Sequence, residues 1–252
     1  MKYQIIGILL LAAIVLVVGA YVHSAGAAVA PQQIPETVTT STIVREDPIV
    51  IGDNGILVRI SMNDILTYHA ELQAKEEGAP IPEQREVDPC CAWMYRSISA
   101  GIRVLWGDTI PERTDVSVTS NLVSCGALHT GWYVTGTGPG MDITSAGRFI
   151  LLQPDGTELT DYSHDARSKI AKNRKADNYQ LVITRISTGE SATISLREEV
   201  FPDRFFTLFK KVKTDSTVTK EEVVEFKTVK NEFRDNLVQK TDDELFNIVR
   251  AK

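Results

Sequence analysis

The sequence predicts an α+β fold in which a mixed or antiparallel sheet packs against helices in a single domain. Two observations carry this prediction. Apolar residues recur at helical spacing in several segments, and between them short alternating runs flank turn residues as in β-hairpins. These helices and hairpins do not alternate strictly, which is typical of α+β rather than parallel α/β domains. The chain has 252 residues, 43% hydrophobic and 24% charged, an ordinary globular composition.

Residues 1–30 predict export. Lys2 precedes an apolar run of about 18 residues, Ile5 to Val22, which is short for a membrane-spanning helix and long for a signal-peptide core. The small residues Ala28-Val29-Ala30 fit a signal-peptidase site. The segment is therefore either a signal peptide or a retained membrane anchor. We favour the anchor, with Lys2 on the cytoplasmic side.

Both alternatives place the rest of the chain outside the cytoplasm, either anchored to the membrane or secreted. Residues 31–46, rich in Pro, Gln and Thr, are predicted to form a linker, and residues 47–252 the folded domain. A net charge of -6 argues against binding to nucleic acid, which requires a basic face. We interpret the one basic cluster as a solvated surface; it consists of Arg167, Lys169, Lys172, Arg174 and Lys175.

Three elements are expected to open the domain: a hairpin over residues 48–60, a helix over residues 61–77 and a helix over residues 89–106. Ser61 and Asp64 have the spacing of a capping box at the start of the first helix. Asp88 is a good N-cap for the second helix, and Pro89 suits its first position. His69 lies on the apolar stripe of the first helix, where a histidine is more often a hydrogen-bonded core residue than a ligand.

The rest of the domain is predicted to consist of short strands followed by helices. The segment 124–140 is so rich in glycine that we expect loop, strand and loop rather than a helix. The remaining expected elements are a strand at 116–118, hairpins around Pro154-Asp155-Gly156 and around residues 187–190, and a helix over 204–213. They are followed by a long helix that Thr219 and Glu222 cap, with an apolar stripe from Phe226 to Leu237, and by a last turn at 241–244. His164 falls in a polar segment and is expected on the surface.

The candidate metal ligands are the three cysteines, Cys90, Cys91 and Cys125, together with His129 and His69. Two thiols and an imidazole brought together would form a site for a soft divalent ion such as zinc. Adjacent cysteines rarely bridge one another, but Cys125 has the option of pairing with either of the other two. In an exported protein the residues thus leave three alternatives: metal ligation, one disulfide with one buried thiol, or three buried thiols.

No catalytic motif stands out, so the sequence does not decide whether the protein is an enzyme. The chain lacks GxGxxG between a strand and a helix, a P-loop, HExxH and GxSxG. The loop Thr135–Gly140 is superficially like a phosphate cradle, but Pro139 removes an N–H where one is needed. Cys125 and His129 would form a nucleophilic pair only if the loop brought them together. We therefore predict no catalytic residue.

The C-terminal segments resemble those of formylmethanofuran dehydrogenase E-type domains. The resemblance rests on the run from Val218 to Phe226 and on Asp242-Asp-Glu-Leu-Phe-Asn-Ile-Val, preceded by the hairpin at 179–196. It covers roughly residues 64–249. In the central region it matches His69 to the first histidine of a His-Gly-His motif and Cys90 or Cys91 to a helix-start cysteine. Further matches are Arg96, Cys125-Gly126 and Thr135-Gly136.

This chain departs from the family pattern at several positions. Glu71 stands in place of the second histidine, a proline-bearing insertion follows, and Cys91 replaces a proline. The resemblance implies an α+β fold, a metal pocket at the helix starts and a homodimer that pairs through its sheets.

The leading hypothesis is an extracytoplasmic, membrane-tethered metal-binding domain. Its metal, zinc or a similar transition metal, would be held by His69, Cys90 or Cys91, and Cys125, with His129 nearby. The alternative is a non-enzymatic domain that binds a small ligand or a partner and is stabilised by a disulfide from Cys125 to Cys90 or Cys91.

Overall fold

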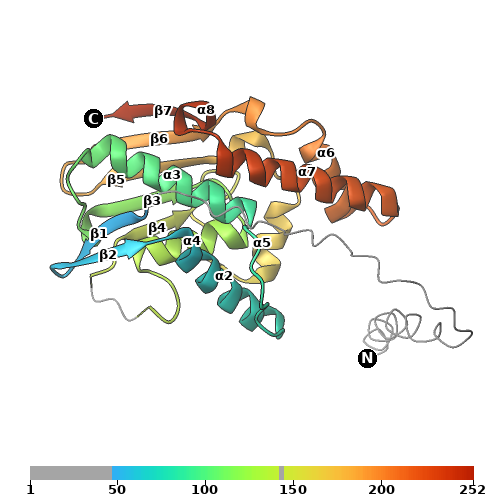
Figure 1. Cartoon of the computed structure of the whole chain (residues 1–252), viewed down its shortest axis with the longest axis horizontal. Helices are drawn as coiled ribbons and strands as arrows, with labels where there is room; N and C mark the ends of the chain where they lie inside the picture. Colours follow the sequence, from blue (N-terminus) through green and yellow to red (C-terminus); the bar gives the residue numbers. More distant parts are fainter. Residues whose placement is uncertain (1–46, 142–144) are drawn as a thin grey trace, which may run out of the picture. The chain divides into compact units, whose positions relative to one another are not determined.

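A five-stranded mixed sheet forms the centre of the domain (Figure 1). The structure is a computed structural model that describes residues 47–141 and 145–252. The predicted signal peptide or anchor and the linker lie outside these residues. Within the described residues, no helix is both long and apolar enough to span a membrane. The predicted α+β fold class is confirmed.

The strands of the large sheet lie in the order β4, β3, β5, β6, β7. Only β3 and β4 run parallel, and the other neighbours are antiparallel. The strands are β3 (Val116–Ser120), β4 (Arg148–Leu151), β5 (Gln180–Arg185), β6 (Ser191–Leu196) and β7 (Phe246–Ala251). A separate antiparallel hairpin consists of β1 (Ile49–Asp53) and β2 (Ile56–Ile60), joined at Asn54-Gly55 as predicted.

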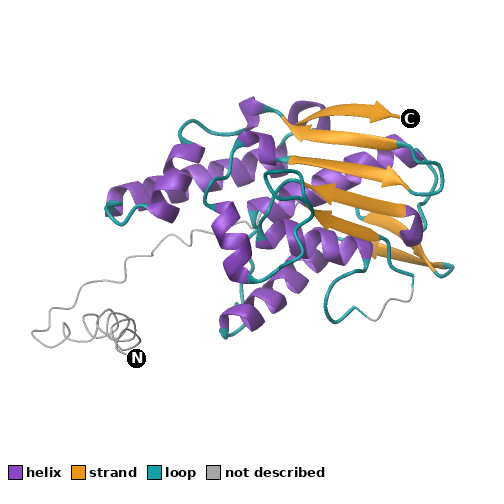
Figure 2. Cartoon of the chain, turned by 180° about the vertical axis from the view of Figure 1, so that it is seen from behind, coloured by secondary structure: helices purple, strands orange, loops and turns teal. Residues whose placement is uncertain are grey.

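Alternate strand residues are buried on one face of the sheet, which the long helix α3 (Pro89–Trp106) covers. Val118, Ile183 and Ile194 on this face are fully buried. A Cβ atom on Gly101 would lie only 2.3 Å from Cγ2 of Ile183, so the glycine lets α3 approach β5 closely. Figure 2 shows the molecule from behind, with the opposite face of the sheet toward the viewer. No described helix crosses this face.

The other helices surround α3. They are α2 (Met62–Glu77), α4 (Cys125–Thr135), α5 (His164–Ala171), α6 (Phe205–Thr214), α7 (Lys220–Gln239) and α8 (Asp242–Leu245). Helices α2 and α4 pack together and against α3, and α6 pairs with α7 (Figure 1). The predicted caps are present: Ser61 and Asp64 form a capping box, and Asp88 accepts hydrogen bonds from the first amides of α3.

The prediction of loop, strand and loop over residues 124–140 is wrong, because Cys125–Thr135 forms α4. Ser124 caps this helix by accepting a hydrogen bond from Ala127 N at 3.1 Å. Its glycines serve close packing: a Cβ atom on Gly131 would lie 2.1 Å from the Phe149 ring. Tertiary contacts thus override the low helix propensity of glycine.

Two smaller predictions also need correction. The turn Pro154-Asp155-Gly156 is present, but its second arm pairs only through an isolated bridge between Leu152 and Glu158. The predicted last turn is α8, which buries Leu245 as expected. The residues after it form the edge strand β7, which was not predicted. It resembles a strand in composition, since β-branched Ile248 and Val249 lie at its centre.

Candidate functional site

A cleft of about 470 Å³ lies where the N-termini of α3 and α4 meet α5, α6 and α7. We call it the thiol cleft, because Cys90 and Cys125 are in its wall. Basic residues and phenylalanines complete the wall: Arg167, Lys172, Arg174, Lys213, Lys230, Phe205, Phe209 and Phe226. Among the residues that the structure describes, two acidic residues line it, Glu77 and Asp88.

A glycine contact brings the two helix N-termini together. A Cβ atom on Gly126 would lie 2.5 Å from Oδ1 of Asp88 and 2.8 Å from the backbone nitrogen of Cys91. The same Asp88 oxygen accepts hydrogen bonds from Cys90 N at 2.9 Å and Cys91 N at 3.2 Å. Any side chain at position 126 would therefore separate α3 from α4 and move the cysteines.

Cys125 contacts a buried arginine from α5. Arg167 Nη1 donates to Cys125 Sγ at 2.9 Å, and Nη2 donates to both carboxylate oxygens of Glu76 at 2.8 and 2.7 Å. Its Nε donates to the carbonyl of Tyr162 at 2.9 Å. Burial raises the pKa of the Cys125 thiol, while the charge of Arg167 opposes this rise. The arginine thus links α5, α2 and α4.

The other cleft cysteine also contacts an arginine. Arg174 Nη1 lies 3.4 Å from Cys90 Sγ, and the guanidinium stacks over Phe209 with Cζ at 4.8 Å from the ring centroid. Burial raises the pKa of Cys90 and that of Cys91. Cys91 is fully buried, and its Sγ lies 3.7 Å from the carbonyl oxygen of Gly126.

The two predicted histidines contact each other. Nδ1 of His69 and Nδ1 of His129 are 3.0 Å apart, so one ring donates to the other. Burial lowers the pKa of His69. Burial, repulsion from His69 whenever that ring is protonated, and the charge of Arg167 lower the pKa of His129 to about 3. Both rings are therefore neutral near pH 7. His129 Nε2 has no hydrogen bond to any described residue and lies 3.8 Å from Oε1 of Glu76.

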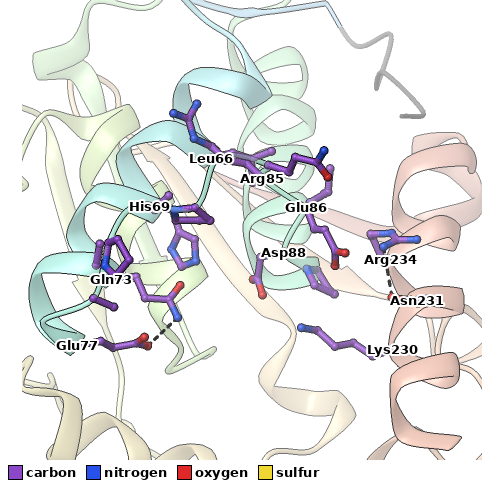
Figure 3. Close-up of a pocket in the computed structure, with 18 residues that line it drawn as sticks. Leu66, His69, Gln73, Glu77, Arg85, Glu86, Asp88, Lys230, Asn231 and Arg234 are labelled. Atoms are coloured by element: carbon purple, nitrogen blue, oxygen red, sulfur yellow. Dashed lines mark hydrogen bonds between the residues drawn. The ribbon is translucent and has the colours of Figure 1, made fainter. Parts of the chain in front are cut away.

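A second cleft of about 430 Å³ adjoins the thiol cleft. Figure 3 shows that His69, Gln73 and Glu77 from α2 line one side of it, and that Lys230, Asn231 and Arg234 from α7 line another. The two clefts share six residues: His69, Gln73, Glu77, Asp88, Pro89 and Lys230. His69 therefore stands at the junction, and its Nε2 is the ring nitrogen left for a ligand.

The structure brings three of the five predicted metal ligands to one wall. His69, Cys90 and Cys125 line the thiol cleft, whereas Cys91 and His129 are fully buried and do not line it. In the described ranges 47–141 and 145–252, no group of three or more His, Cys, Asp or Glu residues is placed to hold a metal ion. Arg167 and Arg174 contact the two cleft thiols instead. The metal site stays a prediction.

The structure also bears on the disulfide and the nucleophilic pair that the sequence left open as alternatives. All three cysteines are free in the structure, so the disulfide from Cys125 is not formed. The nucleophilic pair of Cys125 with His129 is not formed either, because His129 Nδ1 faces His69. Glu71, which stands in place of the second histidine of the family motif, is exposed on α2 and lines neither cleft. His164 is exposed, as expected.

Sequence reasoning missed the two arginines. The basic cluster 167–175 was expected to be solvated, but Arg167 is only 2% exposed and Arg174 lines the cleft. No local pattern distinguishes them from the exposed lysines beside them. What distinguishes the two arginines is their partners, Glu76, Cys90 and Cys125. These partners are distant in the chain, so the sequence around the arginines does not reveal them.

Comparison of the chain with models of protein families gave no match, and comparison with curated proteins gave none either. The resemblance to formylmethanofuran dehydrogenase E-type domains therefore rests on the motifs in the sequence.

Proposed function

We propose that the protein is an extracytoplasmic, membrane-tethered domain that binds a small molecule in the thiol cleft. The observation that supports this most directly is the composition of the cleft wall, which combines aromatic rings with charged groups and thiols in a cleft of about 470 Å³. Ligand pockets in proteins are typically of this size and combine apolar walls with a few polar groups. The extracytoplasmic location is supported by the apolar run in residues 1–30 and the small residues that follow it.

Filling the cleft tests this proposal. Ala171 of α5 lines the cleft, whereas Lys169 on the same helix is exposed and does not line it. We expect phenylnaphthylamine, a neutral fluorescent aromatic probe, to bind the wild-type domain with about one-to-one stoichiometry, because the phenylalanine wall offers it apolar contact. Ala171→Trp should abolish saturable binding, and Lys169→Trp should leave it unchanged. Equal binding by both variants, with native circular dichroism, would place the probe elsewhere.

A second candidate is a site for a soft transition metal in the same cleft. It is favoured by the position of His69, Cys90 and Cys125 in one wall. His129, hydrogen-bonded to Nδ1 of His69, would then orient the ligand imidazole, as neighbours of metal-binding histidines commonly do. A metal bound to Cys125 would have to displace the guanidinium of Arg167 from the sulfur. The metal would supply a cationic centre to which a ligand atom could be attached.

Metal content separates this candidate from the first. If Cys125 is a ligand, Cys125→Ala should lower the zinc or other transition metal per chain by at least about tenfold, because thiolates contribute strongly to such sites. Elemental analysis of the purified protein measures this directly. The same metal content in wild type and variant would exclude Cys125 as a ligand, and the phenylnaphthylamine result would be unaffected.

A further inference from the structure

We propose that the ligand of the thiol cleft is an organic anion with an apolar body, held by its charge to the basic residues of the wall. This inference rests on the proposed function, since it names the chemical class of ligand for the same cleft. Two features of the cleft support the inference: the positive charge of its wall and the phenylalanine rings in the same wall.

The charges of the wall are unbalanced. Five cationic side chains line the cleft, from Arg167 on α5 to Lys230 on α7, against the two carboxylates of Glu77 and Asp88. Asp88 is already committed to the N-terminal amides of α3. The guanidinium of Arg167 is neutralised by Glu76. The remaining basic groups leave a positive surplus that an anionic ligand would balance.

Three lysines supply most of this surplus. Lys172, Lys213 and Lys230 extend from the end of α5, from α6 and from α7, so they surround the cleft from three elements. All three are exposed, and none forms an ion pair within the described residues. Lysine ammonium groups on flexible stems can converge on an anion of varied shape.

Arg174, which is half-buried in the same wall, adds a cation that is less hydrated than these exposed lysines. Its guanidinium lies against Phe209, and its Nε is buried without a hydrogen-bond partner in the described part of the chain. A buried polar atom without a partner is unfavourable, so a ligand oxygen that reached this group would relieve that cost. The N-termini of α3 and α4 open on the same cleft and add positive potential.

Another part of the wall is apolar and lies beside these basic groups. The rings of Phe205 and Phe209 have centroids 6.3 Å apart, and Phe226 lies 6.1 Å from Phe209. Inorganic phosphate or sulfate would leave this surface without contact. An aromatic or aliphatic group joined to a carboxylate, phosphate or sulfonate would contact both the phenylalanine rings and the basic groups beside them.

Two probes of nearly the same shape test the inference. Anilinonaphthalene sulfonate carries a negative charge, and phenylnaphthylamine is its neutral counterpart. We expect the sulfonate to bind wild type about tenfold more tightly at low ionic strength, and this preference to fall as salt is added. The triple variant Lys172→Gln/Lys213→Gln/Lys230→Gln should lose the preference for the sulfonate and bind phenylnaphthylamine as tightly as wild type does.

The matched control is Lys210→Gln/Lys220→Gln/Lys227→Gln, which removes the same charge from exposed positions of α6 and α7 outside the cleft. It should keep the preference for the sulfonate. Equal loss in both triple variants, or equal affinity of wild type for the two probes, would overturn the anion inference and leave a neutral-ligand cleft. Absence of saturable binding by either probe would overturn the proposed function as well.

Discussion

Replacing Arg167 with alanine is expected to lower the free energy of unfolding by about 3 kcal/mol, because breaking a buried ion pair leaves its partner without compensation. The guanidinium is 2% exposed and donates to the carboxylate of Glu76, the sulfur of Cys125 and the carbonyl of Tyr162. We place the cost at the lower end of the range for buried pairs because the Glu76 side chain is 29% exposed and can be partly rehydrated. Urea denaturation measures the change.

A double variant controls for the ion pair. Glu76→Leu removes the carboxylate that Arg167→Ala strands, so the two changes together should cost less than the sum of the single changes. The coupling is expected to be about 1 to 2 kcal/mol, within the range for residues in direct contact. If Arg167→Ala unfolds within about 0.5 kcal/mol of wild type, as an exposed arginine would, then the guanidinium does not hold α5 to α2 and α4.

The elements that were predicted well from the sequence have local determinants. The capping box of Ser61 and Asp64 marks the start of α2, and Asp88 with Pro89 marks that of α3. Helix α4 was missed because its determinants are not local. Gly126 is needed for contact with α3 and Gly131 for contact with Phe149, and neither requirement can be seen in the sequence around them.

The same distinction explains the candidate site. His69, Cys90 and Cys125 were selected by residue type alone, and the structure places all three in the wall of one cleft. The charge of the cleft wall around these three residues could not be predicted from residue type. Burial of Arg167 depends on Glu76, which lies 91 residues away in the chain. The sequence around Arg167 is charged and has no apolar period, so it predicted a solvated surface instead.

The basic wall also changes the chemistry expected of the thiols. A cleft with a positive surplus favours anions over free cations. Arg167 and Arg174 each contact a sulfur atom that a metal ion would otherwise bind. An organic anion would be bound by the positive charge of these arginines, whereas a metal ion would have to displace them from the sulfur atoms. Removal of metal by a chelator should leave binding of the sulfonate probe intact if the anion alone is the ligand.

Arg96 is expected to act in stability rather than in binding. Its guanidinium joins α3 to the end of α7: Nη1 donates to the carbonyl of Leu237 at 3.1 Å, and Nη2 donates to the carbonyl of Lys240 at 3.0 Å. Nη2 also pairs with Asp242 at 2.7 Å. It thus satisfies carbonyls at the end of a helix that have no partner within the helix. The two regions that carry the family resemblance, the central helix and the C-terminal motif, meet at this arginine.

Arg96→Ala should therefore lower the free energy of unfolding by about 3 kcal/mol, since several buried hydrogen bonds from a charged group are lost together. Affinity for the two fluorescent probes should stay within about twofold of wild type, because Arg96 lines the wall of neither the thiol cleft nor the cleft beside it. Arg250→Ala, which removes an exposed pair with Glu190 at 3.1 Å, should cost less than about 1 kcal/mol. Loss of probe binding by folded Arg96→Ala protein would instead give this arginine a role in the site.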